Sequence, residues 1–116
     1  MITGAHAILY SSKADEVRTF LLDVLGTRTV DAGGGWLILA LPPAEVAVHP
    51  VDGPGRHELY LMCDDLDATL ASLSAKGVEH GEVTEQQWGR LTFLKLPDGG
   101  ELGLYQPSHP VAAGLS

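Results

Sequence analysis

The segment Leu96-Pro97-Asp98-Gly99-Gly100-Glu101-Leu102-Gly103-Leu104-Tyr105 decides the fold, because an earlier segment of the chain repeats its pattern. That earlier segment is Leu41-Pro42-Pro43-Ala44-Glu45-Val46-Ala47-Val48. A leucine, a proline, a glutamate, an aliphatic residue, a small residue and a second aliphatic residue recur in the same order. The recurrence predicts that the two halves of the chain are copies of one structural unit.

The first half has the pattern of one helix and four strands. Ser12 is expected to cap the helix, with Asp15 and Glu16 in its first turn, where the helix dipole favours acidic side chains. Apolar residues then recur at helical spacing until Gly26, which is expected to end the helix. The apolar stripe comprises Val17, Phe20, Leu21, Val24 and Leu25, and the expected strands are residues 4–10, 27–31, 36–41 and 45–49.

The second half repeats this order of elements. Asp65 is the expected cap of a helix that carries an apolar stripe and ends at Gly77. Pro97-Asp98-Gly99-Gly100 has the composition of a tight turn, because proline presets φ and glycine accepts a positive φ. The stripe comprises Leu66, Leu70 and Leu73, and the expected strands are residues 57–63, 78–84, 90–96 and 101–105.

The repeat predicts an α+β fold of two tandem β-α-β-β-β modules. A unit of about 55 residues cannot easily cover both faces of its own sheet. Two such units, with their helices outside, can form curved mixed sheets around a pocket. We expect a single domain over residues 1–110, with module one at 1–52, module two at 53–107 and a loosely ordered tail at 108–116.

The composition limits the classes of partner that the protein can bind. The 116 residues carry a formal charge of -8, which repels nucleic acid and anionic membrane surfaces but leaves open a small anionic ligand held by a local arginine. The one cysteine excludes an internal disulfide and a cysteine-based metal cluster. No apolar run approaches the roughly 20 residues of a membrane span, so we expect a soluble cytoplasmic protein.

Three features of the sequence resemble a known family. They are His6 and His57 early in the first strand of each half, the run Asp-Asp-Leu-Asp-Ala-Thr-Leu at 64–70, and Leu-Pro-Asp-Gly-Gly-Glu-Leu-Gly-Leu-Tyr-Gln-Pro at 96–107. Over residues 3–107 the chain resembles the vicinal oxygen chelate superfamily, which includes glyoxalase I, extradiol dioxygenases, fosfomycin-resistance enzymes and bleomycin-binding proteins. Members share the scaffold and differ widely in chemistry.

The resemblance implies a divalent metal, Zn, Ni, Mn or Fe, held by histidine and glutamate from the first and last strands of both units. His6 and His57 match the histidine positions, but the carboxylate positions of the family are occupied by Gly103 and Ala47. Glu101 is two residues away from its expected position, a displacement of roughly 6–7 Å along a strand. The chain therefore departs from the family pattern at the positions that would complete the set of metal ligands.

Strand alternation selects the side chains that line the expected pocket. Glu101, Gly103 and Tyr105 share one face, while Leu102 and Leu104 share the other, which should pack on a helix. The same argument groups Glu45 with His49, His6 with Tyr10, and His57 with Leu59, Leu61 and Cys63. We assign Tyr10, Glu45, His49, Trp88, Arg90 and Tyr105 to the ligand pocket, with Trp88 at its rim and Arg90 as a partner for an anionic ligand or for a surface carboxylate.

Three interpretations of these groups remain open. His6, His57 and Glu101 could hold a metal that acts as a Lewis acid, with Glu101 as the catalytic carboxylate. Glu101 or Glu45 could instead act without metal as a general base in an apolar pocket. In the third interpretation the histidines are pocket-wall or core groups satisfied by hydrogen bonds, and the glutamates are strand-end carboxylates in solvent near the cavity mouth.

The sequence accordingly predicts a glyoxalase/bleomycin-resistance-like protein that binds a small organic molecule. The catalytic form of this hypothesis is a metal-dependent lyase, isomerase or dioxygenase with an altered metal site. The alternative is a protein that sequesters a drug or metabolite without turnover. The resemblance also implies a homodimer.

Overall fold

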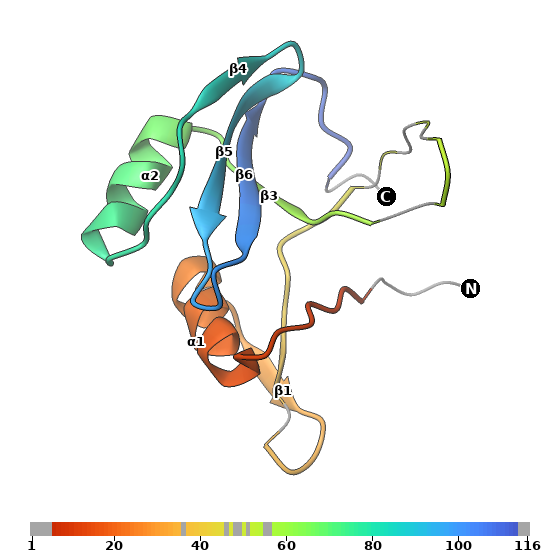
Figure 1. Cartoon of the computed structure of the whole chain (residues 1–116), viewed down its shortest axis with the longest axis vertical. Helices are drawn as coiled ribbons and strands as arrows, with labels where there is room; N and C mark the ends of the chain where they lie inside the picture. Colours follow the sequence, from red (N-terminus) through yellow and green to blue (C-terminus); the bar gives the residue numbers. More distant parts are fainter. Residues whose placement is uncertain are drawn as a thin grey trace.

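The computed structural model describes residues 6–35, 37–45, 47, 50, 52–54 and 57–113 (Figure 1). Within these residues, two helices and two sheets make an α+β fold, which confirms the predicted class. The elements are α1 (Ala14–Leu25), β1 (Thr29–Asp31), β2 (Leu37–Leu39), β3 (Tyr60–Met62), α2 (Leu66–Ala75), β4 (Thr84–Gln86), β5 (Gly89–Lys95) and β6 (Glu101–Pro107).

The larger sheet belongs to the second half of the chain and has the strand order β3-β6-β5-β4. It is mixed, because β3 runs parallel to β6 while β5 is antiparallel to both of its neighbours. The predicted turn joins β5 to β6: Gly99 has a φ of 87° and donates a backbone hydrogen bond of 3.0 Å to the carbonyl of Leu96. The predicted strand at 78–84 is reduced to β4 and an isolated bridge between His80 and Leu94.

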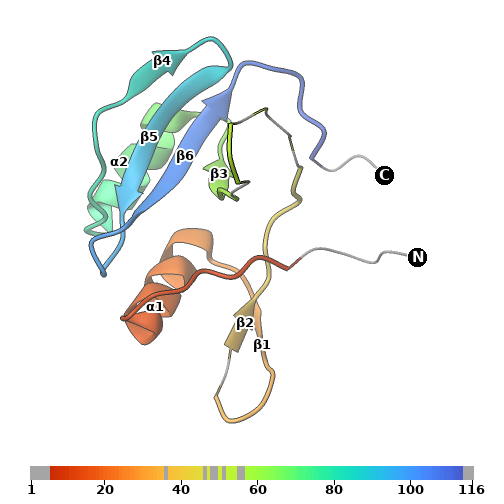
Figure 2. The same ribbon diagram turned by 45° about the vertical axis from the view of Figure 1, so that its right-hand side comes forward.

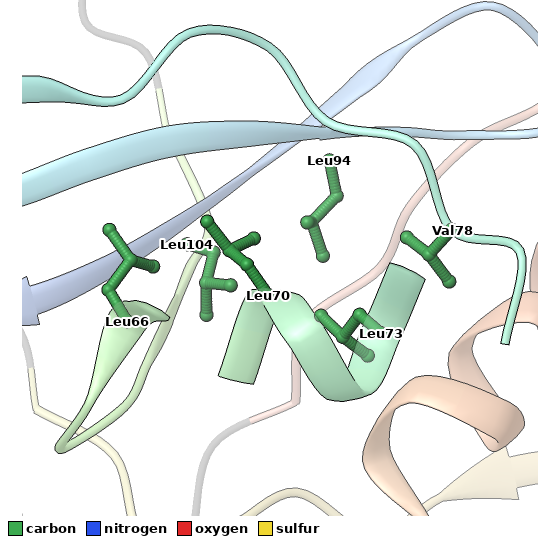
Figure 3. Close-up of a cluster of buried hydrophobic side chains, with 6 residues drawn as sticks. All are labelled: Leu66, Leu70, Leu73, Val78, Leu94 and Leu104. Atoms are coloured by element: carbon green, nitrogen blue, oxygen red, sulfur yellow. The ribbon is translucent and has the colours of Figure 1, made fainter. Parts of the chain in front are cut away.

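Helix α2 covers one face of this sheet and forms the hydrophobic core with it (Figure 3). Asp65 caps α2 as predicted, since its carboxylate accepts a hydrogen bond of 3.0 Å from the N–H of Ala68. Side chains at helical spacing on α2 pack in one cluster with Leu94 of β5 and Leu104 of β6. The core cluster comprises Leu66, Leu70, Leu73, Val78, Leu94 and Leu104.

Helix α1 also packs against this core through Phe20 and Val24, although it belongs to the first half of the chain. It ends at Gly26 as predicted, with a left-handed φ of 62°. Its predicted start at Ser12 is wrong. Lys13 occupies the N-cap position without a side-chain cap, and the N–H of Lys13 donates to the Ser11 hydroxyl instead.

The first half contributes a smaller sheet among the described residues. Strands β1 and β2 form an antiparallel hairpin that lies at the end of the molecule away from the four-stranded sheet (Figures 1 and 2). Residues 6–10 form no strand, contrary to the prediction for 4–10, whose residues 4 and 5 lie outside the described part. Of the predicted strand at 45–49, Glu45 and Ala47 are not in a strand, and residues 46, 48 and 49 are not described.

No helix in the described ranges is long and apolar enough to cross a membrane.

Candidate functional site: an aromatic face of the sheet

The face of the four-stranded sheet opposite α2 carries the candidate site. Leu102 and Leu104 are buried on the α2 side, so strand alternation sends Glu101, Gly103 and Tyr105 to the other side, as predicted. The register of β5 against β6 extends that second face across the sheet, because paired residues point the same way. Phe93 pairs with Gly103.

Gly103 lies between two aromatic side chains. Its partner on β3 is Tyr60, and its partner on β5 is Phe93. The Tyr60 ring lies directly over Gly103: a Cβ atom built at position 103 would stand 2.2 Å from Tyr60 Cδ1, closer than any real contact. Glycine is therefore required here because the ring of Tyr60 occupies the space that a side chain would fill.

Further rings extend this arrangement into what we call the aromatic cluster, defined as Tyr60, Trp88, Phe93, Tyr105 and His109. The Tyr60 ring lies 6.3 Å from that of Phe93 and 6.1 Å from that of Tyr105 between centroids. Trp88 meets Tyr105 edge to face at 5.3 Å and 81°, a favoured geometry for aromatic pairs. Trp88 and Phe93 are 41% and 36% exposed, so the cluster presents ring surface to solvent.

The side chains of β3 face the opposite sides of the sheet from those that the sequence predicts. Leu61 and Cys63, grouped there with His57 as pocket residues, pack against the core beside α2. The reason is register: Leu61 pairs with Leu104, whose side chain faces the helix. Tyr60 consequently takes the aromatic face, and its hydroxyl donates a hydrogen bond of 2.7 Å to Glu58.

Glu45 joins the first half of the chain to this cluster through the C-terminal segment, residues 108–113. Its Oε1 accepts hydrogen bonds from the N–H groups of Ala112 and Ala113, at 2.8 and 3.0 Å. Its other oxygen, Oε2, is 3.9 Å from Nε2 of His109. Within the predicted tail at 108–116, Ala112 and Ala113 thus make hydrogen bonds that the sequence does not mark.

Tyr105 is the polar centre of the cluster. Its hydroxyl lies 3.2 Å from His109 Nε2, and His109 Nδ1 lies 2.7 Å from the carbonyl of Pro110. A carbonyl only accepts, so the tautomer that satisfies both contacts has Nδ1 donating to Pro110 and Nε2 accepting from the Tyr105 hydroxyl. Burial, and then the negative charge of Glu45, raise the pKa of Tyr105 above 10, so this hydroxyl stays protonated at neutral pH.

Arg90 lies on the other face of the sheet. Its guanidinium forms ion pairs with Asp67 of α2 at 3.2 Å and with Glu85 of β4 at 2.9 Å. The pairing raises the pKa of Arg90, with the hydrogen bonds to Asp67 as the largest cause. Of the two fates expected for Arg90, the structure shows the surface ion pair.

The residues present do not fit the metal that the resemblance implies. His6 and His57 are both exposed, and Glu101 is exposed at the start of β6, opposite Lys95. Position 103, the expected carboxylate position, is covered by the Tyr60 ring. Within residues 6–35, 37–45, 47, 50, 52–54 and 57–113, no three His, Cys, Asp or Glu side chains converge as a metal would require.

The remaining predicted pocket residues divide between cluster and solvent. Tyr105, Trp88 and Glu45 are brought together, whereas Tyr10 is 90% exposed with its ring in solvent. His49 lies outside the described residues. A surface hollow of about 510 Å³ lies elsewhere, at the end of α2, and is lined by Ser74, Gly77, Val78, Glu79, His80 and Lys95.

Four residues of the site were missed by sequence reasoning: Glu58, Tyr60, Phe93 and His109. For Tyr60 and Phe93 a signal existed, because a glycine inside a strand often marks close approach by a neighbouring side chain. Their strand partnership with Gly103 depends on register, which local pattern did not supply. For Glu58 and His109 no local signal marks the contacts that they make.

Comparison with known structures identifies proteins that share this fold. The chain is similar to the structure of TnmS3, an antibiotic binding protein from Streptomyces sp. CB03234, with 29% identity over 93% of this chain and 100% of that one and a TM-score of 0.62. It is similar to a glyoxalase/bleomycin resistance protein/dioxygenase superfamily member from Sphaerobacter thermophilus, at 21% identity, 90% and 98% coverage and a TM-score of 0.60. A third similar structure is lactoylglutathione lyase from Agrobacterium tumefaciens, at 16% identity, 90% and 92% coverage and a TM-score of 0.60.

The chain has the vicinal oxygen chelate fold of the glyoxalase/bleomycin resistance protein/dioxygenase superfamily, which the resemblance predicted. No protein-family model and no curated protein sequence matches it.

Proposed function

We propose that this protein binds a flat aromatic small molecule against the aromatic cluster and does so without turnover. The observation that carries the proposal is the Tyr60 ring lying over Gly103, which gives an aromatic surface where the resemblance expects a metal ligand. Exposed ring surface of Trp88 and Phe93 can stack on a planar ligand. The similarity to an antibiotic binding protein supports binding over catalysis.

The charge around the cluster favours a neutral or cationic ligand. Glu58 and Glu45 border it, and the chain carries a formal charge of -8. Arg90, the cation that sequence analysis offered to an anionic ligand, is on the opposite face in ion pairs with Asp67 and Glu85. An anionic ligand would therefore meet net repulsion at this surface.

We also propose that the protein is a homodimer located in the cytoplasm. Ile8, Val30 and Leu41 are large apolar side chains of the first half that stand exposed. A second copy that covered them would remove this apolar area from water. Light scattering across a concentration series tests the dimer, and a mass equal to one chain at all concentrations would contradict it.

Tryptophan fluorescence tests ligand binding directly. The variant Trp36→Phe leaves Trp88 as the only tryptophan. Proflavine, a flat cation, should quench this emission with a saturable curve, while a naphthalene sulfonate of similar size should bind at least about tenfold more weakly. Equal affinity for the two probes would contradict the charge preference.

Two matched variants test whether proflavine binds at the aromatic cluster or elsewhere on the surface. Tyr105→Leu in the Trp36→Phe background should weaken proflavine binding, because an aromatic contact is removed from the cluster. Tyr10→Ala removes a tyrosine that is exposed outside the cluster and should leave binding unchanged. Quenching that never saturates, or that responds equally to both substitutions, would contradict the proposed site.

A further inference from the structure

We infer that the Tyr60–Gly103 pair blocks the metal-ligand position of this fold and commits the sheet face to ring stacking. The inference deepens the proposed function and rests on it for the ligand class. Its structural content is separate: position 103 cannot carry a carboxylate while Tyr60 keeps its place. The chain would then bind its ligand independently of divalent metal.

The first step is the close approach of the two residues. A Cβ atom at position 103 would lie 2.2 Å from Cδ1 and 2.5 Å from Cε1 of Tyr60. Both atoms belong to the Tyr60 ring and not to the far end of a flexible side chain, so the whole ring would have to move. Any side chain at position 103, and a glutamate above all, would have to expel the ring.

The second step is that the ring is held where it is. The Tyr60 hydroxyl donates to Glu58, and the ring packs against Phe93 and Tyr105 at centroid distances of 6.3 and 6.1 Å. The partners of Tyr60 lie on β5, on β6 and in the segment just before β3. Moving the ring would break all of them, so the neighbours of Tyr60 also oppose a side chain at position 103.

The third step concerns what remains for a metal. Glu101 is displaced by two strand positions, roughly 6–7 Å, whereas a metal–oxygen bond of about 2.0–2.2 Å tolerates no such shift. His6 and His57 are exposed, and two imidazoles alone hold a divalent ion weakly. The Tyr60–Gly103 pair therefore places ring surface on this face of the sheet, at the position where a ligand carboxylate would have pointed.

A glycine substitution series tests the steric part. Gly103→Ala should lower Tm by about 5 °C or more, because the methyl group meets the Tyr60 ring. Gly81→Ala is the matched control, since a Cβ there meets nothing nearer than 3.9 Å and its φ is not positive; its Tm should stay within about 2 °C of the parent. In a Tyr60→Ala background, Gly103→Ala should no longer lower Tm.

Metal titration tests the functional part. Protein dialysed against a chelator should show no change in Tm with one equivalent of Zn²⁺, Ni²⁺, Mn²⁺ or Fe²⁺, and proflavine quenching should be unaffected by chelator.

The glycine series has a second background variant. If Tyr60→Ala proves unfolded, Tyr60→Leu, which keeps apolar bulk but lacks the ring, takes its place in the series. The steric step would be overturned if Gly103→Ala were tolerated as well as Gly81→Ala.

Metal independence would be overturned if one equivalent of metal raised Tm and His57→Ala or Glu101→Gln abolished the rise. That result would leave proflavine binding to Trp88 standing, so the inference can fail while the proposed function holds. Conversely, an absence of proflavine binding with unchanged glycine results would contradict the ligand proposal and not the blocked position.

Discussion

The hydroxyl of Ser11 donates a hydrogen bond of 2.5 Å to Oδ2 of Asp98, joining the segment before α1 to the turn between β5 and β6. The two residues are 87 positions apart and belong to different halves of the chain. Asp98 also accepts a hydrogen bond of 2.8 Å from the N–H of Gly100 within its own turn. One carboxylate thus shapes the turn and fastens the first half of the chain to it.

We predict that this contact makes stability depend on acid pH. The Ser11 hydrogen bond, followed by that of Gly100, lowers the pKa of Asp98 below its ordinary value of 3.8. A lowered pKa in the folded state contributes stability above 3.8, and this contribution is lost as pH falls through the folded value. Ser11→Ala should raise the pKa of Asp98, measured by NMR titration, and should flatten the fall in Tm below pH 4.

Ser12→Ala is the matched control, because Ser12 is exposed and stands one residue away from the contact. It should leave the Asp98 titration unchanged. An Asp98 pKa that is the same in the parent and in Ser11→Ala would show that the two halves are not joined through this bond in solution.

Two adjacent residues of β5 should differ in how much their truncation destabilises the protein. Leu94 is 0% exposed in the core against α2, so Leu94→Ala should cost about 2–5 kcal/mol of unfolding free energy in denaturant titrations. Phe93 is on the aromatic face and half open, so Phe93→Ala should cost about 1–2 kcal/mol and should weaken proflavine binding. Equal destabilisation by the two substitutions would contradict the assignment of faces.

The parts of the fold that the sequence predicted are those specified by neighbouring residues. Helix α2 follows from Asp65 as cap and from the leucine stripe, and the β5–β6 hairpin follows from Pro97-Asp98-Gly99-Gly100. In these elements local propensity and burial point the same way. The alternation of Leu102 and Leu104 against Tyr105 was also local, and it placed β6 correctly.

The parts that the sequence did not predict depend on distant partners. Reading β3 from His57 placed Leu61 on the wrong face, because the parallel register with Leu104 decides which side is buried. Tyr60 and His109 entered the site through contacts with Gly103 and Tyr105 that no sequence spacing announces. The sequence assigned Glu45 to the ligand pocket, but it gave no sign of the hydrogen bonds that Glu45 accepts from the C-terminal segment.

Edge-to-face packing of Trp88 on Tyr105 predicts a graded response at position 105. Tyr105→Phe keeps the ring and should hold proflavine affinity within about twofold, whereas Tyr105→Leu should reduce it by about 2- to 12-fold, the value of an aromatic pair. The measurement is quenching in the Trp36→Phe background. An equal loss in both variants would show that the hydroxyl and its His109 contact, rather than the ring, carry binding.

Glu45 should both raise the pKa of Tyr105 and hold the C-terminal segment, and two substitutions separate these roles. Glu45→Gln removes the charge but keeps an oxygen for the N–H groups of Ala112 and Ala113, while Glu45→Ala removes both. In each variant the pKa of Tyr105, measured by NMR, should fall toward 10, with burial keeping it above that value. Only Glu45→Ala should speed amide exchange at Ala112 and Ala113.

The sign of the accompanying pH effect follows from the raised pKa of Tyr105. Its contribution to stability is fully present below 10 and is lost as pH rises through the folded value, so the parent protein should lose Tm at alkaline pH. Glu45→Gln should lose less over the same range, because the repulsion between the carboxylate and the tyrosinate is gone. An alkaline Tm profile identical in parent and Glu45→Gln would contradict the proximity of Glu45 to Tyr105.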